Sequence, residues 1–344
     1  MSIGRWIGAT IALCLLLAAP AQAEISQDEA SSFARQAAAG QTTTLTVSRE
    51  SKAINDISPV ENLYRVTMHG HFVYQEASPP AGYPLPSGTL MEVLVERETG
   101  EVREVHIGGE ATANAARLAK AVRVKPKAHT ATWGGNCKIS NANHCYSVAD
   151  WDMTGGGSGG GEEVEGDVVE TDTTNMNVPE WPSGATVTNE TWVAFHPSGY
   201  WLEIGTIAGY YVGDCCSLRW FYAKENSGGF TIWNTSGVIT PNTWPWYWIL
   251  AEGGGGWCWK IGEHGEATVA CEGGFYTYSN ILEDGAEAAS ENEPTNAGHV
   301  VASFRTVNTG EWHTWNKAEP YVNSSHMCQS QFQPYPGNIS YGTC

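Results

Sequence analysis

Hydrophobic and polar residues alternate in short runs from residue 162 to the end of the chain, and no amphipathic helix interrupts them. A period of two is typical of strands with one buried face. Glycine, asparagine, serine and proline separate the runs at near-regular spacing, which is typical of an antiparallel sandwich or barrel. The predicted strands cover residues 164–169, 185–187, 191–195, 201–207, 218–223, 230–233, 246–250, 257–261, 267–270, 275–278 and 300–307. The pattern therefore predicts an all-β module over residues 162–344.

Residues 24–130 follow a different, mixed pattern. Ser26 and Glu29 form a capping-box motif that predicts a helix through about residue 39, where Gly40 would end it. Alternating runs predict strands over residues 43–48 and 63–74, and a hairpin from residues 90–96 and 102–107 around Thr99-Gly100. An alanine-rich run over residues 111–122 predicts a second helix. We expect a small α+β domain with no catalytic residues.

The first 23 residues resemble an export signal. Arg5 precedes an uncharged apolar run from Ile7 to Ala19, and Ala21-Gln22-Ala23 fits a cleavage site. The run is short for a membrane span. We expect a signal peptide over residues 1–23, a secreted protein in the extracellular space or the periplasm, and no membrane attachment after cleavage. A glycine-rich stretch at residues 155–161 marks the end of a linker over residues 131–161.

Charge is distributed unevenly along the chain. The formal net charge is −19, but residues 1–130 carry a net of −1 and residues 131–344 a net of −18. A protein with this much negative charge lacks the basic surface that nucleic acid requires, so no nucleic acid is expected as a partner. The 15 tryptophans and 14 tyrosines exclude bulk disorder. Basic residues gather between Arg117 and Lys127, where they form a solvated linker, a processing site or a contact to the acidic module.

Cysteine usage agrees with export. Eight cysteines follow the signal segment, all after residue 130, which allows up to four disulfides. Two local pairs are expected, Cys137–Cys145 and Cys258–Cys271, because each closes a short loop. No C-x-x-C or H-x-x-x-H spacing is present, so neither a metal nor another cofactor is expected.

Two groups of carboxylates are candidates for chemistry. Glu203 lies in Trp201-Leu-Glu-Ile-Gly205, where alternation places Trp201, Glu203 and Gly205 on one face of a strand. An acidic segment over residues 282–293 holds five more carboxylates, which are either a surface loop or the source of a partner for Glu203. Two carboxyls a few ångströms apart share a proton, so one can activate water while the other donates a hydrogen bond to an oxyanion.

These residues resemble the glutamic peptidase superfamily, the eqolisins and neprosin. The similarity lies in Trp192-Val-Ala-Phe195 followed by Leu202-Glu-Ile-Gly205, in Glu283-Asp-Gly-Ala-Glu287, and in Trp312-His-Thr-Trp315. Asp284 stands where the family motif has tryptophan. The resemblance implies a catalytic pair of Glu203, the protonated oxyanion stabiliser, and Glu287, the ionised base. A shifted register, Glu287-Ala-Ala-Ser-Glu291, keeps Glu291 as an alternative to Glu287.

The combined interpretation is a secreted acid endopeptidase. Its main domain would be an antiparallel sandwich of concanavalin or jelly-roll type over residues 162–344, preceded by an inhibitory propeptide over residues 24–130. We expect a monomer that takes a polypeptide substrate, with Trp192, Trp201 and Trp220 in contact with it. Two alternatives stay open: a glycoside hydrolase using two glutamates, and a non-catalytic protein that binds carbohydrate or cell wall through its tryptophans.

Overall fold

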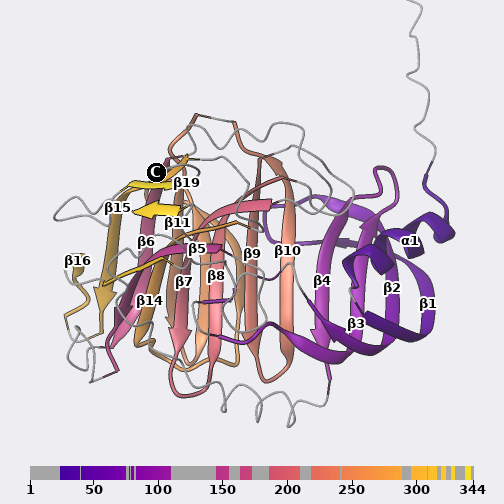
Figure 1. The fold of residues 1–344 in the computed structure, drawn as a ribbon, viewed down its shortest axis with the longest axis horizontal. Helices are drawn as coiled ribbons and strands as arrows, with labels where there is room; N and C mark the ends of the chain where they lie inside the picture. Colours follow the sequence, from indigo (N-terminus) through magenta and orange to yellow (C-terminus); the bar gives the residue numbers. More distant parts are fainter. Residues whose placement is uncertain are drawn as a thin grey trace, which may run out of the picture.

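Two antiparallel β-sheets and one short helix make up the fold in a computed structural model of the chain (Figure 1). The structure describes residues 24–38, 40–74, 77, 79–80, 83–109, 145–154, 163–172, 186–209, 218–240, 242–288, 296–307, 309–315, 319–322, 327–329 and 338–341. Over these ranges no helix has the length and apolar character needed to cross a membrane. The predicted all-β sandwich preceded by a smaller α+β segment is confirmed.

The larger sheet has 11 strands and runs through both halves of the chain. In spatial order these are β1 (Gly40–Ala53), β2 (Val60–Val73), β3 (Ser87–Glu96), β4 (Val102–Gly108), β10 (Gly229–Val238), β9 (Arg219–Asn226), β8 (Tyr200–Gly209), β7 (Thr186–Phe195), β14 (Ile281–Ala288), β5 (Cys145–Asp152) and β17 (Glu319–Val322). The N-terminal strands join the rest where β4 pairs with β10, with Val105 opposite Ile232. The N-terminal segment therefore extends the main sheet.

The smaller sheet has eight strands and packs against one face of the larger one. Its order is β13 (Ala267–Glu272), β12 (Gly256–Ile261), β11 (Trp246–Gly253), β6 (Val164–Asp172), β15 (Asn296–Thr306), β19 (Asn338–Tyr341) and β18 (Met327–Gln329), with β16 (Trp312–Thr314) beside β15. The predicted disulfide Cys258–Cys271 joins directly opposite residues of β12 and β13. Cys137 lies outside the described residues, so the other predicted pair stays a prediction.

Aromatic side chains fill the space between the sheets, the inter-sheet core. Trp151, Trp257 and Trp259 are fully buried there. The Phe195 ring meets the Trp257 ring edge-on at 5.2 Å, and Tyr222 contacts Trp259 at 5.1 Å. Each aromatic side chain buries a large apolar area, and truncating one to alanine costs about 3–5 kcal/mol. This core fixes the two sheets face to face.

The predicted strand over residues 275–278 is wrong. These residues form bends that lead to an isolated bridge between Ser279 and Val164. Phe275 packs into the inter-sheet core against Phe195, whereas Tyr276 and Tyr278 are exposed. The aromatic run therefore anchors a turn, which residue type alone does not distinguish from a strand.

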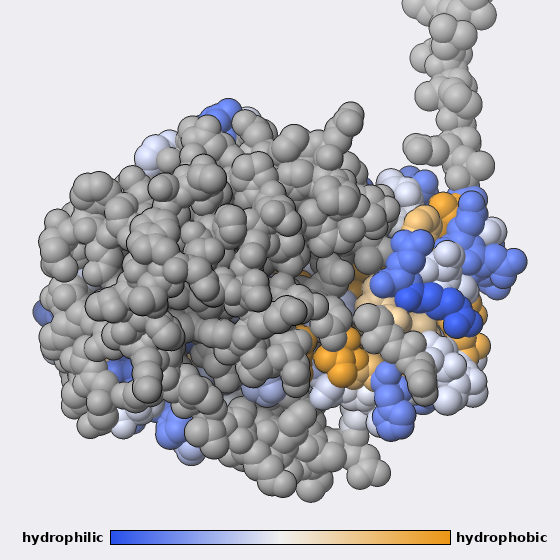
Figure 2. Space-filling model, viewed as in Figure 1, coloured by the Kyte–Doolittle hydropathy of each residue, from blue (hydrophilic) through white to orange (hydrophobic). Residues whose placement is uncertain are grey.

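The N-terminal segment carries helix α1 (Gln27–Ala37) on its sheet. The predicted capping box is confirmed: Ser26 accepts a hydrogen bond from the Glu29 backbone, and the Glu29 carboxylate accepts one from the Ser26 backbone at 2.7 Å. Ala30, Ala34 and Ala37 form the buried stripe of the helix, which packs on β2, β3 and β4. Figure 2 shows hydrophilic residues around smaller hydrophobic areas at this end of the molecule. The polar side of the helix faces solvent.

The predicted hairpin of β3 and β4 is also confirmed. Its turn contains Gly100 at φ +80°, a conformation that favours glycine. The expected helix over residues 111–122, the basic stretch and the expected domain boundary near residue 130 lie outside the described residues. The boundary stays a prediction.

N-terminal residues also help to cover the second face of the larger sheet, hereafter the covered face. Its buried residues include Trp192, Trp201 and Phe230, which cluster with residues of α1 and of β1–β4. The Tyr74 ring contacts the Phe230 ring at 5.6 Å. The Tyr146 hydroxyl donates a hydrogen bond to the Pro79 carbonyl oxygen at 3.2 Å. A segment that follows β2 is thus tied to strands more than 60 residues further along the chain.

Candidate active site

Strand β8 presents Glu203 on the covered face. Trp201 belongs to the cluster on that face, whereas Leu202 and Ile204 lie in the inter-sheet core, so the predicted alternation is confirmed. Glu203 is fully buried. None of the described N–H or O–H groups donates a hydrogen bond to either of its carboxyl oxygens. A carboxyl in such surroundings resists ionisation, because burial in a low-dielectric environment disfavours its charged form.

Glu190 on the neighbouring strand β7 is the partner that the structure brings to Glu203. In the register of the two strands Glu203 lies opposite Trp192, and Glu190 lies opposite Gly205, so the two glutamates are diagonal neighbours. Their carboxyl groups are close enough for each to affect the pKa of the other. Glu190 is also fully buried, and the Thr188 hydroxyl donates to its Oε1 at 2.6 Å.

Glycine at position 205 leaves the space that this arrangement needs. A Cβ built on Gly205 would lie 2.6 Å from the Glu190 Cβ and 2.5 Å from the Asn189 carbonyl oxygen. Contacts this short do not occur between real atoms without a shift of the backbone. The Glu-Ile-Gly segment of β8 therefore supplies Glu203 and, two residues later, Gly205, whose missing side chain leaves room for Glu190 of β7.

Burial and mutual proximity raise the pKa of both acids. Burial is the main cause for Glu203, whose pKa lies well above its ordinary value, and the Glu190 carboxyl raises it further. Burial raises the pKa of Glu190 to about 7, while hydrogen bonds from Glu203 and Thr188 oppose the rise. The two acids therefore titrate together, because burial and like-charge repulsion make it unfavourable for both to be ionised at once. Such a pair combines an acid and a base at one point.

Strand β14 brings two further glutamates to the covered face. Glu283 lies opposite Trp192, and Glu287 lies opposite Thr188, which in turn faces Ile207 of β8. Both glutamates are buried. Glu287 is therefore two strands away from Glu203 and four residues, or about 13 Å, further along the strand direction. The predicted pairing of Glu203 with Glu287 stays a prediction, and Glu190 occupies the position between them.

Asp284, which stands where the resemblance places a tryptophan, points to the inter-sheet core. It lies opposite Thr191, whose hydroxyl donates a hydrogen bond to the Asp167 carboxyl of β6. Trp315 donates a second hydrogen bond to Asp167 at 3.2 Å. Burial raises the pKa of Asp167 well above its usual range, and the Asp284 carboxyl adds to the rise. This position therefore belongs to a buried acidic group away from the covered face.

The predicted substrate-contacting tryptophans separate onto two faces. Trp192 and Trp201 lie on the covered face, fully buried, and the Trp201 ring nitrogen donates to Glu225 at 3.1 Å. Trp220 lies opposite Thr206, on the inter-sheet side, with its ring 4.7 Å from the Tyr247 ring. The structure thus brings two of the three tryptophans to the glutamates. Glu291 lies outside the described residues.

Glu190 was missed because Thr188-Asn-Glu-Thr191 is polar throughout. The sequence pattern predicts two separate runs, at 185–187 and 191–195, where the structure has the continuous strand β7. A period-two pattern of Thr188, Glu190 and Trp192 is nevertheless present, in phase with Trp201, Glu203 and Gly205. That phase could have identified the residue. In the parts of the chain that the structure describes, no three His, Cys, Asp or Glu side chains are placed to hold one metal ion.

The fold and these residues together define a β-sandwich protein with two buried, neighbouring carboxyls on one face of its larger sheet. No protein-family model matches the sequence, and no curated protein sequence matches it. A search of solved structures finds similarity to scytalido-glutamic peptidase bound to a peptide-based transition state analogue: 11% identity, a TM-score of 0.41, 61% of this chain and 100% of the other. A second structure of scytalido-glutamic peptidase, with a transition state analogue inhibitor, has 14% identity and a TM-score of 0.37 over 57% of this chain and 98% of the other. Similarity of this extent carries no information about activity, which rests on the site itself.

Proposed function

We propose that the protein is a secreted acid peptidase that hydrolyses peptide bonds with the Glu203–Glu190 pair. The observation that supports this most is that two fully buried glutamates are diagonal neighbours on one face of the sheet and that each affects the pKa of the other. Paired carboxyls that share one proton can activate water and protonate or polarise a carbonyl, as aspartic proteases do. The Thr188 hydroxyl holds Glu190 by a hydrogen bond, and Trp192 lies opposite Glu203 in the register of the two strands.

Each carboxyl has a distinct role in this proposal. Glu203 keeps its proton and donates a hydrogen bond to the carbonyl oxygen of the scissile bond, where negative charge develops. Glu190, held by the Thr188 hydroxyl at 2.6 Å, removes a proton from the attacking water. The carboxyl of Glu203 plays the part that the glutamine of the eqolisin motif would play, because a protonated carboxyl and a carboxamide both present a donor.

Exposing the covered face to solvent would change the pKa values of the pair. While the pair is buried, burial holds the pKa of Glu190 at about 7, so both acids are protonated in acid. Solvent access removes the main cause of this rise and lets the Glu190 pKa fall toward its ordinary value of 4.5. Like-charge repulsion then keeps Glu203 protonated while Glu190 ionises. The singly protonated, active pair would therefore form at mildly acid pH.

The N-terminal segment is the proposed inhibitor. Tyr74 and Pro79 contact the covered face directly, and residues 131–344 carry a formal charge of −18 against −1 for residues 1–130. Acid protonates carboxylates of the acidic part and weakens any attraction to the basic residues of the first part. We propose that acidification leads to hydrolysis of a peptide bond near residue 130, after which residues 24 to about 130 leave as a propeptide.

A glycoside hydrolase is less well supported. Retaining enzymes hold their two carboxyls about 5–5.5 Å apart, and inverting enzymes hold them further apart, to admit the sugar or a water molecule. Glu203 and Glu190 are diagonal neighbours on adjacent strands, and each affects the pKa of the other, as expected of carboxyls that share one proton. A shared proton favours a mechanism like that of the aspartic proteases, and hence peptide-bond hydrolysis over glycoside hydrolysis.

Casein and xylan cleavage by the acid-incubated protein tests the proposal. We expect casein cleavage at pH 4–6, no xylan cleavage, and release of an N-terminal fragment of roughly 100–140 residues. Glu190→Gln should reduce casein cleavage by at least about 10²–10³-fold, the scale of general-base catalysis. Glu225→Gln is the matched control, a buried glutamate of the same face outside the pair.

Two outcomes would change the assignment. If Glu287→Gln abolished cleavage while Glu190→Gln left it intact, the base would be Glu287 and Glu190 a structural neighbour. Absence of casein cleavage after the N-terminal fragment had left would overturn the peptidase proposal.

A further inference from the structure

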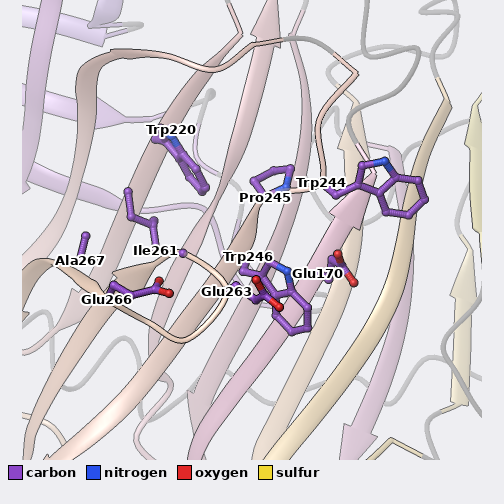
Figure 3. Close-up of a pocket in the computed structure, with 10 residues that line it drawn as sticks. Glu170, Trp220, Trp244, Pro245, Trp246, Ile261, Glu263, Glu266 and Ala267 are labelled. Carbon is purple, nitrogen blue, oxygen red and sulfur yellow. The ribbon is translucent and has the colours of Figure 1, made fainter.

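A cavity of about 770 Å³ opens at one end of the sandwich, where β9 and β11 begin (Figure 3). Trp220 reaches it from the inter-sheet side of the larger sheet, whereas Trp246 and Glu170 lie on the outer face of the smaller sheet, because their neighbours Tyr247 and Val169 are in the inter-sheet core. The side chains that matter for its chemistry are three tryptophans and three glutamates: Trp220, Trp244, Trp246, Glu170, Glu263 and Glu266. The cavity is therefore separate from the Glu203–Glu190 pair.

Glu263 and Glu266 form the acidic side of the cavity, and the turn that carries them is fixed by several contacts. Gly262, at φ +100°, leaves room for Glu266: a Cβ there would lie 2.0 Å from the Glu266 Oε2. The Gly262 carbonyl oxygen accepts hydrogen bonds from the Trp248 ring nitrogen at 2.7 Å and from the Gly265 backbone at 3.0 Å. These contacts fix the turn between β12 and β13, which also carries Glu263.

Glu170 closes the opposite side of the cavity. It is opposite Trp246 in the register of β6 and β11, and the Trp246 ring nitrogen hydrogen-bonds to it. Burial raises the pKa of Glu170, and the nearby Glu263 carboxylate contributes to the rise. Three carboxyls that face one space are stabilised by a positive charge between them. The ten residues that line the cavity include no lysine, arginine or histidine.

The three tryptophans that line the cavity favour one kind of cation over others. Indole rings attract cations over their faces, and a planar guanidinium stacks on them more favourably than a compact ammonium does. A guanidinium also presents paired N–H donors to carboxylates. We propose that this cavity binds a guanidinium group, the side chain of an arginine in a peptide or protein. The site does not depend on peptidase activity, since none of its residues lies on the covered face.

Binding of N-acetylarginine methylamide, followed by titration calorimetry and tryptophan fluorescence at neutral pH and low salt, tests the proposal. N-acetylcitrulline methylamide has nearly the same shape without the charge, and xylohexaose represents a saccharide ligand. We expect saturable binding of the arginine compound, at least roughly tenfold weaker binding of the citrulline compound, and weakening with added salt.

Substitutions of exposed side chains locate the binding. Trp244→Ala should weaken arginine binding roughly three- to tenfold, and the double change Glu263→Gln with Glu266→Gln roughly tenfold or more. Trp312→Ala and Glu311→Gln are matched controls outside the cavity and should bind as the parent does. All five positions are exposed, so the variants should fold, which circular dichroism checks.

Several results would overturn the proposal. These are equal binding of the arginine and citrulline compounds, no saturable arginine binding, binding of xylohexaose alone, or arginine binding that the cavity substitutions leave unchanged. A peptidase without arginine binding would remove this site and leave the proposed function standing. Arginine binding without peptidase activity would do the reverse.

Discussion

Replacing Glu190 with glutamine should change how the stability of the protein depends on pH. In the folded protein burial raises the pKa of this acid from its ordinary value of 4.5 to about 7. The folded state therefore binds the proton more tightly than the unfolded state. Stability from this group is fully present below about pH 4.5 and is lost as the pH rises to about 7. The change corresponds to about 3 kcal/mol, at about 1.4 kcal/mol for each pH unit between the two values.

Glutamine preserves the shape and can still accept the hydrogen bond from Thr188, but it does not ionise. Between pH 4.5 and pH 8 the free energy of unfolding of the parent should therefore fall by about 3 kcal/mol more than that of Glu190→Gln. Urea unfolding of the full chain at several pH values measures the difference, which should move the midpoint by about 1 M or more. Glu311→Gln, on the exposed surface, is the control for loss of one carboxyl. Equal pH dependence in parent and Glu190→Gln would refute the burial argument.

Three further changes test other parts of the structure. Gly205→Ala should destabilise the fold by about 1–3 kcal/mol because the new Cβ overlaps Glu190, whereas Gly273→Ala meets nothing within 4 Å and should be neutral; thermal unfolding compares the two. Replacing Cys258 and Cys271 with alanine should cost about 3 kcal/mol, since the disulfide closes a loop of 13 residues; an unchanged melting temperature would contradict this. Tyr146→Phe removes a hydrogen bond to the N-terminal segment and should speed release of the N-terminal fragment in acid, as followed by mass spectrometry.

Local patterns in the sequence predicted much of the secondary structure. The capping box of Ser26 and Glu29, the hairpin around Gly100 and the Cys258–Cys271 disulfide depend on residues close together in sequence, and all three are confirmed. The pairing of β4 with β10 joins residues more than 100 positions apart. Nothing local specifies such a pairing, so the continuation of the N-terminal strands into the main sheet was not predicted.

The candidate site shows the same division. Alternation placed Glu203 correctly on the face of Trp201 because a strand has a fixed period. Its neighbour Glu190 depends on the register between β7 and β8, and a shift of one residue would have turned Glu190 to the other face. The residues on both sides of Glu190 are also polar, so the hydrophobic pattern did not indicate a strand there. Register depends on how neighbouring strands pack across the sheet, and the sequence of one strand does not determine this packing.

The pH dependence of kcat/KM on a peptide substrate, measured for the protein freed of its N-terminal fragment, tests the carboxyl pair most directly. Activity in the parent should fall at high pH as Glu203 loses its proton, because the oxyanion donor is lost and a second negative charge appears beside Glu190. Glu203→Gln keeps a donor at every pH, so it should retain measurable turnover with its upper pH limit shifted upward, while Glu190→Gln should be inactive throughout. A Glu203→Gln variant as inactive as Glu190→Gln, or one with the pH profile of the parent, would contradict the assignment.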